Sequence, residues 1–392
     1  MSAGRERLWH VPALHTEGDA GVHRRVTWLE LFFDLAFVVA IAKAAHGVAE
    51  HPSWGGVGAY AVTFLPIFWT WNAATYYAER FETEGLETRL IAFLQMLVVA
   101  GLAANAHHAT STSFAGFALA YAAGRVLMTV LWGRAGVHVP AFRPVAARFV
   151  TWFGVSIALV LASVLADGPV RWLLFGAALL VDVATPLSTL RRQRTLPRFS
   201  DSKLPERFGL FTILVLGEAV AGAIAGLADA AWTPRTVLAG ALAMAVAFAL
   251  WWLYFDFAGR RTPRPTVGAT LAWTYLHMML AMALAASGAT LAAVVPAAGV
   301  VDAPVRAVVA GGAGLAVVVI GLLDRVLVRA DDEPTHGWAW ALLTAVGAAV
   351  AALSVAPLTA AGLLGGMVAL LAVAMGYGLW VWVAPMRLRT GR

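Results

Sequence analysis

The chain has 392 residues, of which 60% are hydrophobic and only 13% are charged, and its mean hydropathy is +0.76. Soluble domains are roughly 45–50% apolar and about 25% charged, so this composition indicates a polytopic membrane protein. The net charge of +6 comes largely from basic residues between apolar segments, where topology explains it, so we do not expect nucleic acid as a partner. The chain has no cysteine, which excludes disulfides and thiol chemistry.

Residues 1–24 contain no apolar run that resembles a secretory signal, and we predict a cytoplasmic tail there. After it, apolar stretches recur along the whole chain. About 20 helical residues cross the hydrocarbon core of a bilayer. We therefore predict an all-α fold of about twelve transmembrane helices, at 27–48, 58–78, 89–107, 113–133, 149–166, 170–190, 206–228, 235–257, 267–292, 305–328, 337–356 and 360–383.

Basic residues are distributed unequally between the two ends of these spans. If the chain starts inside, the two tails and alternate loops carry 22 Lys and Arg residues, whereas the other side carries three: Arg171, Arg235 and Arg306. This asymmetry predicts that both termini are cytoplasmic. The most basic loop, 191–207, is a topology signal and is expected to contact anionic lipid.

The two halves of the chain resemble distant copies of each other. Trp71 matches Trp251 at an offset of 180 residues, and Arg125 matches Arg325 at an offset of 200. Six spans per half give parallel repeats, an arrangement that in transporters places the substrate between the halves. Duplication also builds large bundles that have no pathway. The predicted division is a tail at 1–24, a first six-helix half at 25–190, a basic linker at 191–205, a second half at 206–384 and a cytoplasmic tail at 385–392.

Two carboxylates, Glu30 and Asp34, stand four residues apart on one face of the first predicted helix. An ionised group within a span is costly in lipid and normally faces protein or water. The pair is either a proton or cation site or part of a structural ion-pair network. Candidate basic partners at similar depth are Arg80, Arg125, Arg207 and Arg325.

Three further polar residues fall within predicted spans. Glu218 lies near glycines at 217, 222 and 226, a spacing that both packs helices closely and makes room for a cavity. Asp182 precedes Pro186 by one turn, which predicts a bent helix whose free backbone carbonyls join a polar pocket. His277 corresponds by repeat to Gln95, and it is either a titrating group or a neutral, hydrogen-bonded residue of the bundle.

These considerations give two sets of candidate residues, and we expect no metal site, cofactor or catalytic residue. The set assigned to a substrate or proton pathway is Glu30, Asp34, Asn72, Gln95, Arg125, Asp182, Glu218, Asp256 and His277. The set assigned to structural ion pairs is Arg80, Arg207, Asp324 and Arg325.

Several blocks of the sequence resemble one bacterial family. They are Trp28–Ala40 (WLELFFDLAFVVA) with His46, Tyr77–Thr83 (YAERFET) with Phe93–Met96 (FLQM), Glu206–Ile213 (ERFGLFTI) with Leu216–Glu218 (LGE), and Tyr254–Asp256 (YFD) with Tyr275–His277 (YLH). In this order, over roughly residues 25–330, the chain resembles the low temperature requirement A (LtrA) family. The resemblance implies a multi-span membrane protein with a suggested tie to growth in the cold, and it implies no substrate or reaction.

Three classes of function fit the sequence. The first is a transporter or permeation protein for a small solute or ion, with or without proton coupling; it would be driven by gradients, since the sequence has no phosphate-binding loop. The second is a membrane scaffold or a lipid- or stress-responsive protein. The third is an intramembrane enzyme that uses paired carboxylates such as Asp182 and Asp256, although the sequence lacks the common hydrolase motifs. Of these, we favour transport.

Overall fold

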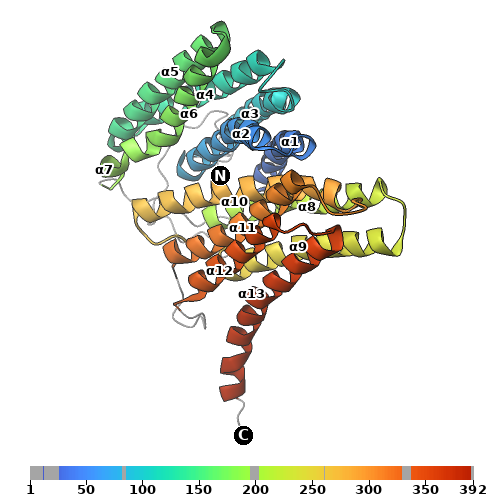
Figure 1. Cartoon of the computed structure of the whole chain (residues 1–392). Helices are drawn as coiled ribbons and strands as arrows, with labels where there is room; N and C mark the ends of the chain where they lie inside the picture. Colours follow the sequence, from blue (N-terminus) through green and yellow to red (C-terminus); the bar gives the residue numbers. More distant parts are fainter. Residues whose placement is uncertain are drawn as a thin grey trace. The chain divides into compact units, whose positions relative to one another are not determined.

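The computed structural model describes Pro12 and residues 26–81, 85–194, 203–259, 261–328 and 337–389, without the side chains of 382–389. Most of the predicted N-terminal tail, the greater part of the basic linker and the end of the C-terminal tail lie outside the described residues. The described chain is helical, with two isolated backbone bridges, Pro263 to Leu327 and Val300 to Thr359 (Figure 1). The all-α prediction is thereby confirmed.

The helices follow one another with short connections. Their bounds are α1 (Trp28–Glu50), α2 (Trp54–Phe81), α3 (Leu86–Ala106), α4 (Phe114–His138), η2 (Pro140–Phe142), α5 (Arg143–Leu165), α6 (Gly168–Ser188), α7 (Leu190–Gln193), α8 (Leu204–Ala228), α9 (Pro234–Phe257), α10 (Val267–Val294), α11 (Ala303–Val326), α12 (Ala339–Ala352), η3 (Leu353–Val355) and α13 (Ala360–Arg389).

Ten of the described helices are long and apolar enough to cross a membrane. This number defines a multi-pass membrane protein. Two predicted spans differ from the rest. Helix α2 has 28 residues but is not among the ten, and α12 with η3 forms a shorter apolar segment, Ala339–Val355. Twelve spans therefore remains a prediction.

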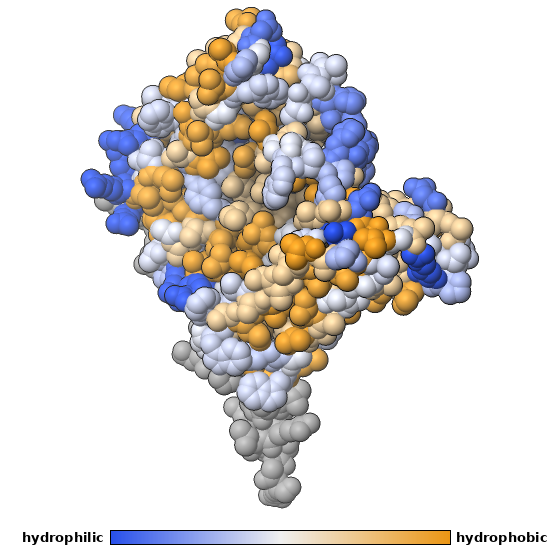
Figure 2. All heavy atoms as spheres, in the orientation of Figure 1, coloured by the Kyte–Doolittle hydropathy of each residue, from blue (hydrophilic) through white to orange (hydrophobic). Residues whose placement is uncertain are grey.

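Large apolar side chains lie on the outside of these helices. On α6, Leu173 and Leu180 are each 72% exposed, and Leu187, a further seven residues on, is 48% exposed. A spacing of seven residues keeps the three on one face of the helix, while the fully buried Asp182 lies on another. Figure 2 shows apolar side chains over much of the face in view. This arrangement, apolar outside and polar inside, suits a helix surrounded by lipid.

The chain forms two compact units. The first comprises residues 1–44 and 62–204, and the second comprises 45–61 and 205–392. In the first unit, α4 packs against α3 and α5, and α5 packs against α6 (Figure 1). Aromatic rings fill part of this packing, with Trp132 stacked on Phe149 at a centroid distance of 4.5 Å.

In the second unit, α11 contacts α9, α10 and α12, and α13 packs against α9. Glycines permit several of the closest approaches between these helices. A Cβ on Gly222 of α8 would lie 2.2 Å from the carbonyl oxygen of Gly288 on α10, and one on Gly314 of α11 would lie 2.4 Å from the carbonyl oxygen of Gly347 on α12. The glycines are therefore required where the backbones meet.

Candidate functional site

A fully buried ion pair lies inside the first unit. Arg125, near the middle of α4, and Asp182 of α6 both have no exposed surface, and 4.0 Å separates Arg125 Nη1 from Asp182 Oδ1. The hydroxyl of Tyr121, also on α4, donates to Asp182 Oδ2, and the hydroxyl of Ser156 on α5 donates to the same oxygen at 2.7 Å. We call Arg125, Asp182, Tyr121 and Ser156 the Arg125–Asp182 centre.

The backbone carbonyl of Asp182 also takes part in this centre. Because Pro186 has no N–H, it cannot donate the usual helical hydrogen bond to the carbonyl of Asp182, four residues earlier. Trp69 of α2 fills that place, since its indole Nε1 donates to the Asp182 carbonyl oxygen at 3.0 Å. The freed carbonyl predicted from the sequence thus joins a polar contact between α2 and α6.

Arg125 has a mixed environment of polar and aromatic groups. Its Nη2 donates to Thr70 Oγ1 of α2 at 3.4 Å. The guanidinium lies over the ring of Tyr121 at 5.1 Å and over that of Phe153 at 5.2 Å. These cation–π contacts offset part of the cost of burying the charge.

The Arg125–Asp182 centre leaves hydrogen-bonding capacity unused. Among the described residues, Arg125 Nε, Arg125 Nη1 and Asp182 Oδ1 have no hydrogen-bond partner. Leaving a buried donor or acceptor unpaired costs about 1–3 kcal/mol, and more when the group is charged. Arg125 and Asp182 therefore lie close enough to attract each other while three of their polar atoms remain without a hydrogen bond.

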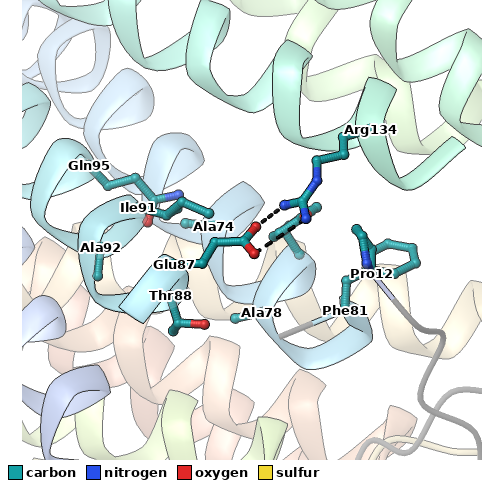
Figure 3. Close-up of a pocket in the computed structure, with 11 residues that line it drawn as sticks. Pro12, Ala74, Ala78, Phe81, Glu87, Thr88, Ile91, Ala92, Gln95 and Arg134 are labelled. Carbon is teal, nitrogen blue, oxygen red and sulfur yellow. Dashed lines mark hydrogen bonds and ion pairs between the residues drawn. The ribbon is translucent and has the colours of Figure 1, made fainter. Parts of the chain in front are cut away.

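A second polar feature of the first unit is a cavity of about 50 Å³ between the end of α2, the start of α3 and the end of α4. Arg134 and Glu87 point toward each other across it in a two-point ion pair, and Gln95 lies farther along α3 (Figure 3). Gln95 Nε2 donates to Met128 Sδ at 3.6 Å. A water molecule needs roughly 10–15 Å³ measured in this way, so the cavity has room for a few.

Glu30 and Asp34 have different surroundings. Glu30 forms a capping box at the start of α1, because its Oε2 accepts from the Thr27 N–H at 2.7 Å while its own N–H donates to Thr27 Oγ1 at 3.2 Å. Glu30 also pairs with Lys203 at 3.3 Å. Asp34, fully buried, accepts from Trp71 Nε1 at 2.7 Å.

Glu218 of α8 lies in the second unit. Its Oε2 is 3.6 Å from His46 Nε2, and the His46 side chain is 51% exposed. The nearby glycines differ in their surroundings. Gly222 and Gly226 contact the backbone of α10, whereas a Cβ on Gly217 would meet open space. Close helix packing, one of the two predicted uses of this glycine spacing, is therefore present at 222 and 226.

The second unit also holds His277 and Asp256. His277 Nδ1 is 2.9 Å from the carbonyl oxygen of Trp273, and its Nε2 is 3.0 Å from the Tyr254 hydroxyl. Asp256 Oδ2 accepts from Trp252 Nε1, one turn earlier on α9, at 2.6 Å. Both nitrogens of His277 thus have partners within the bundle.

The residues assigned to structural ion pairs form several kinds of contact. Arg80 Nη2 donates to Gln193 Oε1 at 3.3 Å, and the guanidinium lies 5.7 Å from the centre of the Phe142 ring. Asp324 pairs with Arg261 at 3.0 Å, and Arg325 lies over the Trp340 ring at 4.7 Å. Arg207 is buried near the start of α8. Of these four residues, Asp324 forms a described ion pair, as the sequence predicted.

Of the predicted pathway residues, the structure brings Arg125 and Asp182 together. Sequence reasoning missed Tyr121, Ser156, Trp69 and Thr70. A signal for Tyr121 exists, since it precedes Arg125 by four residues and therefore shares its face of α4. Ser156 carries no comparable signal in its apolar helix. No three His, Cys, Asp or Glu side chains gather as a metal site in the part of the chain that the structure describes.

The fold and the buried charges define an all-α, multi-pass membrane protein with polar groups inside its helix bundles. Residues 25–375 match the family described as bacterial low temperature requirement A protein (LtrA), and the chain belongs to this family. The chain is also similar to an uncharacterized protein of Rhizobium meliloti (strain 1021), with 26% identity over 272 residues, covering 65% of this chain and 66% of the relative. No solved structure matches it.

Proposed function

We propose that this protein is a gradient-driven transporter or permeation protein for a small solute or ion, and that the Arg125–Asp182 centre is its working site. The observation that carries the proposal is the unused hydrogen-bonding capacity of two fully buried, oppositely charged groups. A pair with a purely structural role gains most when it closes to hydrogen-bonding distance and satisfies every donor and acceptor. A site that binds and releases a ligand keeps such atoms free.

The centre also has the chemistry that proton coupling requires. Asp182 offers a carboxylate that can take up a proton, and Tyr121 and Ser156 hold one of its oxygens while the other faces Arg125. Protonation of Asp182 would remove its attraction for Arg125 and leave the guanidinium free to bind an anionic or dipolar group. The two groups thus form a switch in which proton uptake changes the charge presented to a solute.

The proposed transporter has twelve spans built as two parallel six-helix repeats. Both of its termini lie in the cytoplasm, and it is located in the bacterial inner membrane. The asymmetric distribution of basic residues and the matched positions in the two halves support it. Anionic lipid at the exposed Arg191 and Arg194 is part of the same proposal.

Asp182→Asn tests the working site in full-length protein reconstituted into vesicles that contain a pH-sensitive dye. Wild-type protein should carry protons when pH gradients are imposed in the presence of Na⁺, K⁺ or a panel of small solutes. The substitution removes the titrating group but keeps its size, so flux should fall at least tenfold. Asp167→Asn is the matched control, because Asp167 is exposed and pairs only one turn away with Arg171.

The outcomes separate the alternatives. Flux that is equal in Asp182→Asn and wild type removes Asp182 from the mechanism. Wild-type vesicles that carry nothing under any gradient contradict transport and favour a scaffold. The separate pairing of Glu30 with Lys203, Glu87 with Arg134 and Asp324 with Arg261 favours that second candidate, since each pair neutralises one carboxylate and fixes the helix that carries it.

An intramembrane enzyme is the third candidate. The two carboxylates that such an enzyme would use, Asp182 and Asp256, belong to different units and have separate partners, Tyr121 and Ser156 for the first and Trp252 for the second. Turnover of a lipid or peptide that depends on Asp182 would support an enzyme over a transporter.

A further inference from the structure

The cavity between α2, α3 and α4 has a lining that suits a ligand of narrow chemistry. Eleven residues line it, and two of them, Glu87 and Arg134, are charged. Their side chains pair with each other and are only 7% and 16% exposed. Because these two charges balance, a ligand with a net charge would bring an uncompensated charge into a mostly buried place. The lining therefore favours an uncharged ligand.

Helix α3 lies between this cavity and the outside of its helix bundle. Glu87, Ile91 and Gln95 line the cavity and follow at intervals of four residues, so they share one face of α3. The opposite face carries large apolar side chains that are 48–53% exposed: Leu90, Phe93, Leu94 and Leu97. The surface that suits lipid chains therefore lies on the far side of α3 from the cavity.

Polar groups lie at both ends of the cavity. The Glu87–Arg134 pair is at one end, and Gln95 is at the other, about two turns farther along α3 (Figure 3). Gln95 Nε2 donates to Met128 Sδ, whereas Gln95 Oε1 accepts no hydrogen bond from the described residues. This oxygen is not among the fully buried atoms without a partner, and the cavity is the space beside it. An open acceptor of this kind requires a ligand with an O–H or N–H donor.

The size and the walls of the cavity limit the ligand further. At roughly 10–15 Å³ for each water-sized position, a volume of about 50 Å³ takes about three to five non-hydrogen atoms. Between the polar ends the walls are apolar and include Ala74, Ala78, Ile91 and Ala92. Asn72, a predicted pathway residue that is also buried on α2, does not line this cavity. A molecule that fits has a short apolar part and one polar end.

We propose that this cavity binds a compact, uncharged molecule with an O–H or N–H donor, a small amide or alcohol, whose donor bonds Gln95 Oε1. Its apolar part lies against the alanines at 78 and 92. Met128, the partner of Gln95, follows Arg125 by about one turn of α4. If the protein transports solutes as proposed above, the cavity holds the solute one helical turn from the Arg125–Asp182 centre. Only this last step rests on the proposed function.

The chain has two glutamines, Gln95 and Gln193, which makes the site directly observable. Full-length protein in detergent, with ¹⁵N in its glutamine side-chain amides, gives one NMR signal set for each, and Gln95→Leu assigns them. Acetamide and propan-2-ol should shift the Gln95 signals saturably, with half-saturation at about 1–100 mM, because so small a ligand makes few contacts. The Gln193 signals should show no saturable shift, since that amide bonds Thr189 beside α7.

Three further molecules of nearly the same size test the chemistry of the ligand. Acetone is uncharged but has no donor, acetate is an anion without a donor, and acetamidinium is a cation with donors. Each should bind at least about tenfold more weakly than acetamide or propan-2-ol at constant ionic strength. A saturable response to only one of those two molecules identifies amides or alcohols as the ligand class.

Two substitutions fill the cavity from different helices and leave Gln95 in place. Ala92→Leu on α3 and Ala78→Leu on α2 each put a larger side chain into the space, so each should abolish the saturable shift. Ala100→Leu is the matched control, because Ala100 is an exposed position on the far side of α3 and its substitution leaves the cavity unchanged. Unchanged Gln193 signals report that a variant is folded, and the second substitution decides if the first prevents folding.

The proposal is overturned if neither acetamide nor propan-2-ol shifts the Gln95 signals saturably. A cavity that holds water alone gives this result. Acetone that binds as well as acetamide, or a shift that persists in both filled variants, also overturns it. Loss of transport in Asp182→Asn has no bearing on these outcomes, because binding is measured without a gradient.

Discussion

Buried charged residues are placed and paired differently in the two units. In the first unit, helices α4 and α5 direct polar side chains toward the carboxylate of Asp182 on α6, and Trp69 of α2 bonds the backbone carbonyl of the same residue. In the second, Asp324 meets Arg261 near the end of α11, and Asp256 lies near the end of α9. The Asp324 side chain has no exposed surface either, but it lies in the last turn of its helix, whereas Asp182 lies farther from the end of α6. The two buried carboxylates therefore differ in their depth along the helix and in the number of polar groups directed at them.

The predicted sequence repeat sharpens this contrast. Arg125 and Arg325 are matched positions, yet Arg125 has no exposed surface and faces Asp182, while Arg325 is in the last turn of α11 and lies over Trp340. Trp71 donates to Asp34 and is fully buried, whereas its counterpart Trp251 is 39% exposed. The buried contacts of Arg125 and Trp71 in the first half are therefore not repeated at the matched positions of the second half.

The largest expected effect comes from breaking the Arg125–Asp182 pair. Arg125→Met leaves Asp182 buried without its cation, and we expect the free energy of unfolding to fall by about 3–5 kcal/mol. Replacing both residues, Arg125→Met with Asp182→Leu, should recover most of this loss because no lone charge remains. Thermal or denaturant unfolding in detergent measures both variants.

Arg261→Met is the matched variant in the second unit. It removes the partner of Asp324, which is equally buried but lies in the last turn of its helix, where fraying can hydrate the carboxylate, so we expect a loss about half as large. Equal losses from the two substitutions would show that the cost of an unpaired carboxylate does not depend on its depth within the helix. The comparison between the two units would then be wrong.

The next effect concerns the glycine contacts of the second unit. A Cβ on Gly222 would lie 2.2 Å from the carbonyl oxygen of Gly288, so Gly222→Ala forces α8 and α10 apart and should cost about 1–3 kcal/mol. Gly217→Ala places its methyl group in open space and should be neutral or stabilise the helix by up to about 1 kcal/mol. Unfolding of the two variants under the same conditions measures the difference, and a Gly222→Ala protein as stable as wild type would contradict the close approach.

Much of the fold could be predicted from the sequence because lipid imposes simple rules. Long apolar runs predicted helical spans, and the structure has ten such helices in the described chain. Two predicted spans fall outside this group. Helix α2 contains glycines, Pro66 and polar residues and is less apolar than the ten, and the 17-residue segment Ala339–Val355 is short for a span.

The candidate site was less accessible to sequence reasoning. Asp182 was found because a carboxylate within an apolar run stands out, and Pro186 indicated a free carbonyl beside it. Its partners Ser156 and Trp69 are 26 and 113 residues away along the chain. Contacts between distant helices depend on how each helix is rotated about its axis, which apolar periodicity determines poorly when every face is apolar. The same reason explains why Lys203 was not foreseen as a partner of Glu30.

The smallest expected effect concerns the start of α1. Gln serves as well as Glu in a capping box, so Glu30→Gln should keep the contacts with Thr27 and lose only the charge attraction to Lys203. Both side chains are buried, but Lys203 lies just before α8 and its long side chain can turn the ammonium toward water, so we expect a decrease in the free energy of unfolding of about 0.5–1.5 kcal/mol, measured as above. Thr27→Ala removes the cap itself and should cost about 1 kcal/mol, as should Thr233→Ala, which removes the capping box of α9 in the second unit.

The same Glu30→Gln variant decides between the two roles considered for this residue. A carboxylate that carries protons cannot be replaced by an amide, so a pathway role predicts that flux in vesicles falls as it does in Asp182→Asn. A capping role predicts unchanged flux with only the small loss of stability, and Thr27→Ala should then behave in the same way. Lost flux in Glu30→Gln together with normal flux in Thr27→Ala would extend the working site to the start of α1, whereas retained flux in both confines it to the Arg125–Asp182 centre.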